Sequence, residues 1–192
     1  MKPKRAEYRN AIRSRNLIKE AFVEILNEKP IDKITVTDIV RRADINRGTF
    51  YAHYVDTKDV LEQIQNEIIE KILQFIGEFK YESLIKDTNL ILSKLTKYFE
   101  QDLNFYRKLV SGYGSEEFLN QIKVIFIDAI YHNKEIPTKI KNKKAFEVQI
   151  NFFAGGIISL YEDWFNGKIN GTLTDLNKEI MVLIKFMYEF FT

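Results

Sequence analysis

The chain has 192 residues, of which 45% are hydrophobic and 29% charged, and its formal net charge is +2. This length suits one large domain or two small ones and is sufficient to bury an apolar core without covalent cross-links. Cysteine is absent, which excludes disulfides, thiolate zinc sites and cysteine nucleophiles and is typical of a reducing cytosol. No apolar run follows the basic N-terminus and none approaches membrane-spanning length, so we expect a cytoplasmic protein with no membrane partner.

Positive charge is concentrated at the N-terminus. Residues 1–19 hold seven lysines and arginines against the single acid Glu7, a local balance of +6, whereas residues 65–192 carry 16 basic and 17 acidic residues. This asymmetry indicates a polyanionic partner at one end of the chain. On charge alone, a solvated basic tail explains the same pattern equally well.

Helical spacing dominates the chain, and no sustained two-residue alternation of the strand type occurs, so we predict an all-α protein of about nine helices. The first helix ends before Pro30. Thr35 and Asp38 have the spacing of a capping box for a short helix over about 36–43. Asn46 is a good N-cap for another short helix over about 47–54. Thr57 is expected to cap a long fourth helix.

Boundaries in the second half are weaker. Thr172 and Asp175 form a second capping-box pattern, Ser115 is expected to cap a helix, and the lysine-rich stretch 132–144 is expected to be a mobile loop. The remaining helices are predicted over about 87–101, 104–110, 144–166 and 174–191.

The two short helices, joined by a tight turn at residues 44–45, have the arrangement of a helix-turn-helix, which lays its second helix in the major groove of DNA. Phe50 should face the core. Arg47 can bond the O6 and N7 atoms of guanine, and Thr49 can contact a base edge. Gly48 allows close approach to the DNA backbone. Tyr51, His53 and Tyr54 can donate to phosphates, although burial is an equally good explanation of both tyrosines.

Residues 34–64 resemble the DNA-binding domain of the TetR/AcrR family of bacterial transcriptional regulators, and the match extends over about 10–65. It is carried by the segment Gly48-Thr49-Phe50-Tyr51-x-His53-Tyr54 and by Asp59-x-Leu61. The resemblance implies phosphate contacts from the start of the second helix and base contacts from Arg47 and Thr49. Family members usually carry a lysine at the position of Thr57, whereas here the lysine follows as Lys58. The expected DNA-binding residues are Thr35, Thr37, Asn46, Arg47, Gly48, Thr49, Tyr51, His53, Tyr54 and Lys58.

The resemblance further implies a DNA-binding domain over 1–65 and an effector-binding and dimerisation domain over 66–192, with a homodimer formed by the last two helices. Their apolar spacing supports this independently, because each helix has two apolar faces and both must be buried. Which face forms the dimer stays open, and a larger intrachain core is the alternative. The expected interface residues are Phe146, Ile150, Phe153, Ile157, Leu160, Leu176, Ile180, Leu183 and Met187.

Aromatic residues are frequent in the second domain up to about residue 166, and they suggest that this domain binds a small apolar or aromatic effector. Aromatic residues at helical spacing more often pack in the core than contact a ligand, so a core position is the alternative for each of them. The segments 105–122 and 152–167 also resemble regulators of dihydroxyacetone-kinase operons, which suggests action through another protein. The candidate effector residues are Phe99, Tyr106, Tyr113, Phe126, Phe152, Tyr161 and Trp164.

No enzyme signature is complete. The stretch 112–115 resembles a phosphate loop, but Glu116 and Glu117 in the following turn would repel an anion. Two distant histidines without cysteine predict no metal site, and no cofactor is expected. The resemblance to the TetR/AcrR family implies instead a homodimeric repressor that binds a palindromic DNA operator and is released by a small molecule. The alternative is a helical adaptor of the same fold that has lost DNA contact and acts through a protein partner without a small-molecule inducer.

Overall fold

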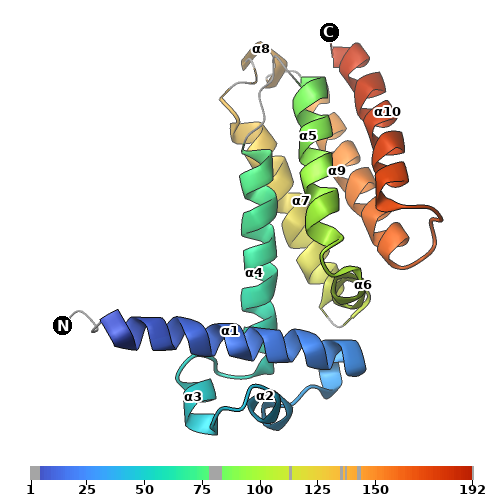
Figure 1. Cartoon of the computed structure of the whole chain (residues 1–192). Helices are drawn as coiled ribbons and strands as arrows, with labels where there is room; N and C mark the ends of the chain where they lie inside the picture. Colours follow the sequence, from blue (N-terminus) through green and yellow to red (C-terminus); the bar gives the residue numbers. More distant parts are fainter. Residues whose placement is uncertain are drawn as a thin grey trace. The chain divides into compact units, whose positions relative to one another are not determined.

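The computed structural model describes residues 5–77, 84–112, 114–134, 136, 138–141 and 144–191. Throughout these residues the regular structure is helical and no strand occurs, which confirms the predicted fold class (Figure 1). The predicted helices are present, and the four-residue α8 lies in addition within the expected loop 132–144. The elements are α1 (Arg5–Glu28), the 3-10 turn η1 (Ile31–Lys33), α2 (Val36–Arg42), α3 (Arg47–Tyr51), α4 (Thr57–Ile76), α5 (Leu84–Phe99), α6 (Leu103–Ser111), α7 (Ser115–His132), α8 (Thr138–Lys141), α9 (Lys144–Phe165) and α10 (Leu173–Phe191).

The chain forms two compact units, Met1–Ile68 and Ile69–Thr192, so that the boundary falls within α4. Among the described residues, none of the helices is both long enough and apolar enough to cross a lipid bilayer.

The first unit has a small core built on α1. In Figure 1, α2 and α3 lie on the same side of α1. Apolar side chains at helical spacing on α1 pack against two buried residues of α2 and one of α3. The apolar surface buried in this way stabilises two short helices that would be unstable in isolation. The buried residues are Ile18, Phe22, Ile25 and Leu26 of α1, Ile39 and Val40 of α2, and Phe50 of α3.

The capping box at the start of α2 is formed as predicted. The Asp38 amide donates to Thr35 Oγ1 over 3.2 Å, and the Thr35 amide returns a hydrogen bond to the Asp38 carboxylate over 2.9 Å. Lys29 Nζ also donates to this carboxylate over 2.6 Å. The hydrogen bonds from Lys29 and Thr35 hold the pKa of Asp38 far below its usual value, so the carboxylate stays charged. The second predicted capping box, between Thr172 and Asp175, is present as well.

Two other predicted caps are wrong. At the start of α4 the side chain of Asp56, one residue before Thr57, accepts from the amides of Lys58 and Asp59 over 2.8 and 3.0 Å. A carboxylate one residue earlier reaches two free amides, and Thr57 is already helical. At α7 the N-cap is Gly114 in a left-handed conformation (φ 79°) without a side-chain cap bond, and Ser115 is the first helical residue.

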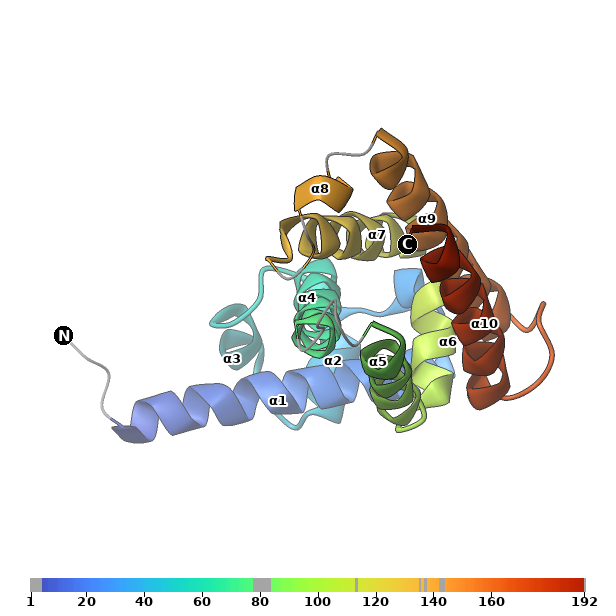
Figure 2. The same cartoon turned by 90° about the horizontal axis from the view of Figure 1, so that it is seen from above.

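The second unit is a helical bundle in which α10 packs against α5 and α9, and α7 packs against α9 (Figures 1 and 2). One buried polar group lies among α5, α9 and α10. Asn177 donates to Leu92 O over 3.2 Å and to Thr96 Oγ1 over 2.5 Å, and it accepts from Tyr161 Oη over 2.5 Å. Its donors and its oxygen are thus all used within the bundle, which fixes α10 against both neighbours.

We expect Asp38→Asn to lower the stability of the first unit by about 1 kcal/mol at neutral pH, because the neutral amide loses the charged capping interaction. A carboxylate whose pKa is lowered on folding stabilises the protein above the unfolded pKa, near 4, and loses this effect as the pH falls. The difference between the variant and the original chain should therefore shrink below about pH 4. Urea unfolding followed by circular dichroism at several pH values measures it.

Asp32→Asn is the matched control, because Asp32 is exposed and pairs with its neighbour Lys33 at 3.2 Å. It should change the free energy of unfolding by less than about 0.5 kcal/mol. An effect of Asp38→Asn no larger than this control would show that the capping box contributes nothing measurable.

Candidate nucleic-acid interface

The turn between α2 and α3 is made by one residue with a left-handed backbone. Asp44 has φ 50°, a conformation that aspartate tolerates better than most residues. The amide of Ile45 then donates to Val40 O over 3.0 Å. This closes α2 and reverses the chain, so that α3 begins two residues later.

The start of α3 is fixed by Asn46. Its Oδ1 accepts from the Thr49 amide over 2.7 Å and from Thr49 Oγ1 over 3.2 Å, as the predicted N-cap requires. A Cβ added at Gly48 would lie 3.1 Å from the same Oδ1. The absence of a side chain at Gly48 therefore leaves room for the Asn46 cap, and it also lets a partner approach the backbone of α3 closely.

Phe50 is completely buried and sets the rotation of α3. The rings of Tyr51 and Phe50 form a T-shaped pair with centroids 5.4 Å apart, and Tyr51 is still 56% exposed. Arg47 and Gly48 are also exposed, and Thr49 is half-buried. The first turn of α3 is thus open to a partner while its core side chain is fixed.

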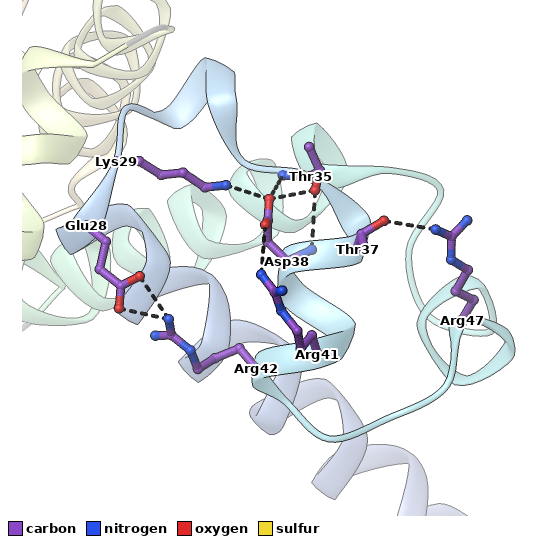
Figure 3. A network of polar contacts seen from close by, with 8 residues as sticks. All are labelled: Glu28, Lys29, Thr35, Thr37, Asp38, Arg41, Arg42 and Arg47. Atoms are coloured by element: carbon purple, nitrogen blue, oxygen red, sulfur yellow. Dashed lines mark hydrogen bonds and ion pairs between the residues drawn. The ribbon is translucent and has the colours of Figure 1, made fainter.

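Arg47 and Thr37 meet between the two helices. Arg47 Nη2 donates to Thr37 Oγ1 over 2.9 Å (Figure 3). The threonine oxygen can accept from the guanidinium while its own proton remains free to donate. The bond therefore brings together a residue expected to reach a base and one expected to reach a phosphate.

Two groups of ion pairs hold α2 in place (Figure 3). Arg42 forms hydrogen bonds to Glu28 over 2.8 Å and to Glu24 over 3.2 Å, and these bonds raise the pKa of the guanidinium. Asp38 accepts from Lys29, as described above. Sequence reasoning did not identify Lys29 or Arg42, because their partners are nine to eighteen residues away and no short motif records such a contact.

His53 is half-buried, and Lys58 lies exposed in the first turn of α4. Burial, together with the nearby charge of Arg15, lowers the pKa of His53. The lowered pKa favours the uncharged imidazole, which can offer one N–H donor instead of two.

The assignment of Tyr54 to the DNA contacts is corrected. Only 2% of the residue is exposed, and its Oη is buried without a hydrogen-bond partner in the part of the chain that the structure describes. Burial raises its pKa to about 12. Tyr54 packs beside Phe50, with ring centroids 5.9 Å apart, so its aromatic body is used in the core and its hydroxyl cannot reach a phosphate.

The basic N-terminal stretch is divided by the structure. Arg9, Arg13 and Arg15 are exposed along α1. Lys19 is instead paired with both oxygens of Glu67, each at 2.8 Å. Residues 1–4 and the side chains of residues 5–8 lie outside the described part.

The candidate effector residues separate into different environments. Phe99 lies at the centre of ring contacts to Tyr106 at 4.9 Å and to Tyr161 at 6.1 Å, and Trp164 joins the same cluster through Phe165. Of the four candidate effector residues in this cluster, Phe99, Tyr106 and Trp164 are less than 10% exposed, so their rings mainly fill space between helices. Phe126 is half-buried, and Tyr113 lies outside the described residues.

Phe152 is corrected in the opposite direction. It is 74% exposed on α9, so it does not belong to the aromatic cluster. Val148, one helical turn earlier, is exposed as well. These two residues form part of the second apolar face of this helix.

The expected dimer residues are only partly at the surface. Those buried within the subunit are corrected to core residues, since each fills the intrachain interior: Phe146, Ile150, Leu176 and Ile180. Leu183 is 47% exposed. Phe153, Ile157 and Leu160 are half-buried, and the side chain of Met187 lies outside the described part.

Comparisons with known proteins agree with these observations. A family model described as bacterial regulatory proteins of the tetR family matches residues 18–64, and one described as a transcriptional regulator C-terminal region matches residues 86–186. The uncharacterized HTH-type transcriptional regulator YxbF of Bacillus subtilis (strain 168) is 30% identical over 95 residues, which are 46% of this chain and 25% of that protein. The match therefore spans about a quarter of that relative.

Two solved structures share the fold over nearly their whole length. The dihydroxyacetone kinase operon activator DhaS superposes with a TM-score of 0.68 at 17% identity, over 92% of this chain and 97% of that one. A TetR transcriptional regulator from Streptococcus agalactiae 2603V gives a TM-score of 0.61 at 18% identity, over 93% and 97%. At such identities the likeness concerns the fold alone.

The two tyrosines of this region give a matched test. We expect Tyr51→Phe to weaken DNA binding by about tenfold or more, because an exposed phenol can donate to a phosphate and a hydrogen bond to a charged group is worth about 1.5–3 kcal/mol. Tyr54→Phe removes a hydroxyl that has no partner among the described residues, so DNA affinity should stay within about twofold and stability should be unchanged or higher. Fluorescence anisotropy with DNA from upstream of the protein's own gene measures both. A greater loss of affinity for Tyr54→Phe than for Tyr51→Phe would contradict this assignment.

Proposed function

The chain belongs to the TetR family of bacterial transcriptional regulators, and from this membership we propose that it is a cytoplasmic homodimeric repressor, released from a palindromic operator by a small molecule. The observation that carries the proposal is the open first turn of α3, where Arg47 is exposed and held by Thr37. A forked guanidinium at the start of a recognition helix suits the O6 and N7 atoms of guanine.

The proposed contacts fall into two groups. Arg47 and Thr49 read base edges from α3, and the exposed backbone at Gly48 and Asn46 lets the helix approach the groove. Phosphate contacts position the helix without reading sequence. They come from Thr35, Thr37, Tyr51, His53 and Lys58. Arg9, Arg13 and Arg15 add counterion-releasing charge.

The dimer is proposed to form through exposed apolar residues of the last two helices. Phe152 and Val148 of α9 and Leu183 of α10 supply apolar area that a second subunit would cover. A twofold axis then repeats the recognition helix, so that two α3 helices can enter successive major grooves about 34 Å apart.

Release requires that the effector bind one arrangement of the dimer better than the other. The favoured arrangement would hold the two recognition helices at a separation that no longer fits the operator. A tenfold loss of operator affinity needs only about 1.4 kcal/mol of such coupling.

A helical adaptor that acts through a protein partner is the second candidate. It is favoured by the exposure of Phe152, which a protein partner could cover, and by the close ring packing of the residues expected to line an effector pocket. A gel-shift with DNA from upstream of the protein's own gene separates the two functions, since the adaptor gives no shift.

Arg47→Ala tests the reading of bases. We expect it to remove the preference for guanine at one position of each half-site and to cost about 1–3 kcal/mol on the preferred sequence. Binding to a panel of operators with single base changes measures the preference. Arg9→Ala is the control, because a phosphate contact should weaken all sequences about equally and lower the salt slope. If Arg47→Ala weakened every operator to the same extent, Arg47 would not read a base.

Leu183→Glu tests the dimer. A charge placed in an apolar interface should convert a dimer into a chain of 22.7 kDa, as measured by light scattering after size exclusion. Val124→Glu is the control, since Val124 is at least as exposed as Leu183 but lies on α7. A dimer that survives both Leu183→Glu and Phe152→Glu would rule out this interface.

A further inference from the structure

A groove runs between α5 and α10, and none of the candidate effector residues that the structure describes lines it. Its volume is about 700 Å³, within the range of small-molecule sites. On one side it extends from Asn89 of α5 to Glu100, which directly follows this helix, and on α10 it extends from Thr174 to Lys185. Each wall is therefore about 16 Å long. Figure 1 shows the two helices side by side and running in opposite directions.

The floor of the groove is partly apolar. Leu92, Met181 and Val182 supply apolar surface. Asn177 and Thr96 also line it, but their polar side-chain atoms bond to each other and to the bundle. Because these groups are satisfied internally, polar recognition of a ligand must come from the rim.

The rim is basic. Three lysines line the groove, Lys97 from α5 and Lys178 and Lys185 from α10, against the single acid Glu100. Lys178 is partly neutralised by Asp175 at 3.1 Å. Within the described residues, neither Lys97 nor Lys185 forms an ion pair or a hydrogen bond. Two ammonium groups that form no ion pair within the described residues, beside an apolar floor, attract an anion that also carries an apolar part.

We propose that this groove binds a small amphipathic anion, a molecule with one carboxylate or phosphate group and a short apolar chain. The anion lies among the lysines and the chain covers Leu92 and Met181. The site rests on the proposed function, in which such a molecule would be the effector. The wall formed by α10 also carries the exposed Leu183 next to Val182, so a ligand held between Lys97 and Lys185 acts on a helix proposed to form the dimer.

The experiment titrates the full chain with octanoate, octyl phosphate and 1-octanol, each below its micellar concentration. Calorimetry gives the affinity, and backbone amide shifts in nuclear magnetic resonance give the place. We expect both anions to bind with shifts confined to α5 and α10, and the alcohol of equal chain length to bind at least fivefold more weakly. Lys97→Gln/Lys185→Gln should weaken the anions by roughly fivefold or more. Lys144→Gln, an exposed lysine of α9 outside the groove, should change nothing.

Four results would overturn the site, three of them in the ligand titration. The anions could fail to bind at millimolar concentration, bind no better than 1-octanol, or bind Lys97→Gln/Lys185→Gln as well as the original chain. If the groove amides shifted instead on raising the protein concentration, a second subunit would occupy the groove, and the proposal would be wrong. Operator binding is measured on the same samples. A chain that binds DNA but no anion refutes the groove alone, whereas a chain that binds the anions but no DNA refutes the regulator.

Discussion

The burial of Phe50 is the constraint on which the interface depends. α3 has only five residues, far fewer than an isolated helix needs for stability in water. It is helical because Phe50 is inserted against the core of the first unit and because Asn46 satisfies its first amides. Once this side chain is fixed, the rotation of α3 is fixed, and Arg47, Gly48 and Tyr51 remain exposed. The position of Arg47, the residue proposed to read a base, thus depends on the packing of Phe50 three residues later.

The features that sequence reasoning predicted correctly are those with local causes. Thr35 with Asp38 and Thr172 with Asp175 are three residues apart, and a capping box needs nothing beyond that spacing and an open helix start. Local reasoning failed where two local solutions compete. Asp56 and Thr57 can both cap α4, and the carboxylate, with stronger acceptor oxygens, takes the position. The Lys29–Asp38 contact joins two segments that no periodicity connects.

For the last two helices, α9 and α10, local sequence patterns do not determine which face is buried. Both have two apolar faces, and periodicity cannot tell which neighbour covers which face. Ile150 and Ile180 face the subunit interior, whereas Phe152 and Leu183 do not. Tyr54 raised the same ambiguity within one residue, since a phenol suits a core or a phosphate equally well. In each case the deciding quantity is the area buried by a neighbouring helix, which depends on tertiary packing alone.

α10 combines three surfaces around one axis. One contains Ile180 and packs inward, a second contains Leu183 and is exposed, and a third contains Lys178 and Lys185 and borders the groove. A ligand shifts a conformational equilibrium only by its difference in affinity between two arrangements. The affinity of a ligand held between α5 and α10 would differ between two arrangements if α10 moved relative to α5, because Lys97 and Lys185 lie on separate helices. The satisfied amide of Asn177 resists that movement. The strength of any coupling through α10 is therefore set by the competition between this buried hydrogen-bond network and the charges at the rim.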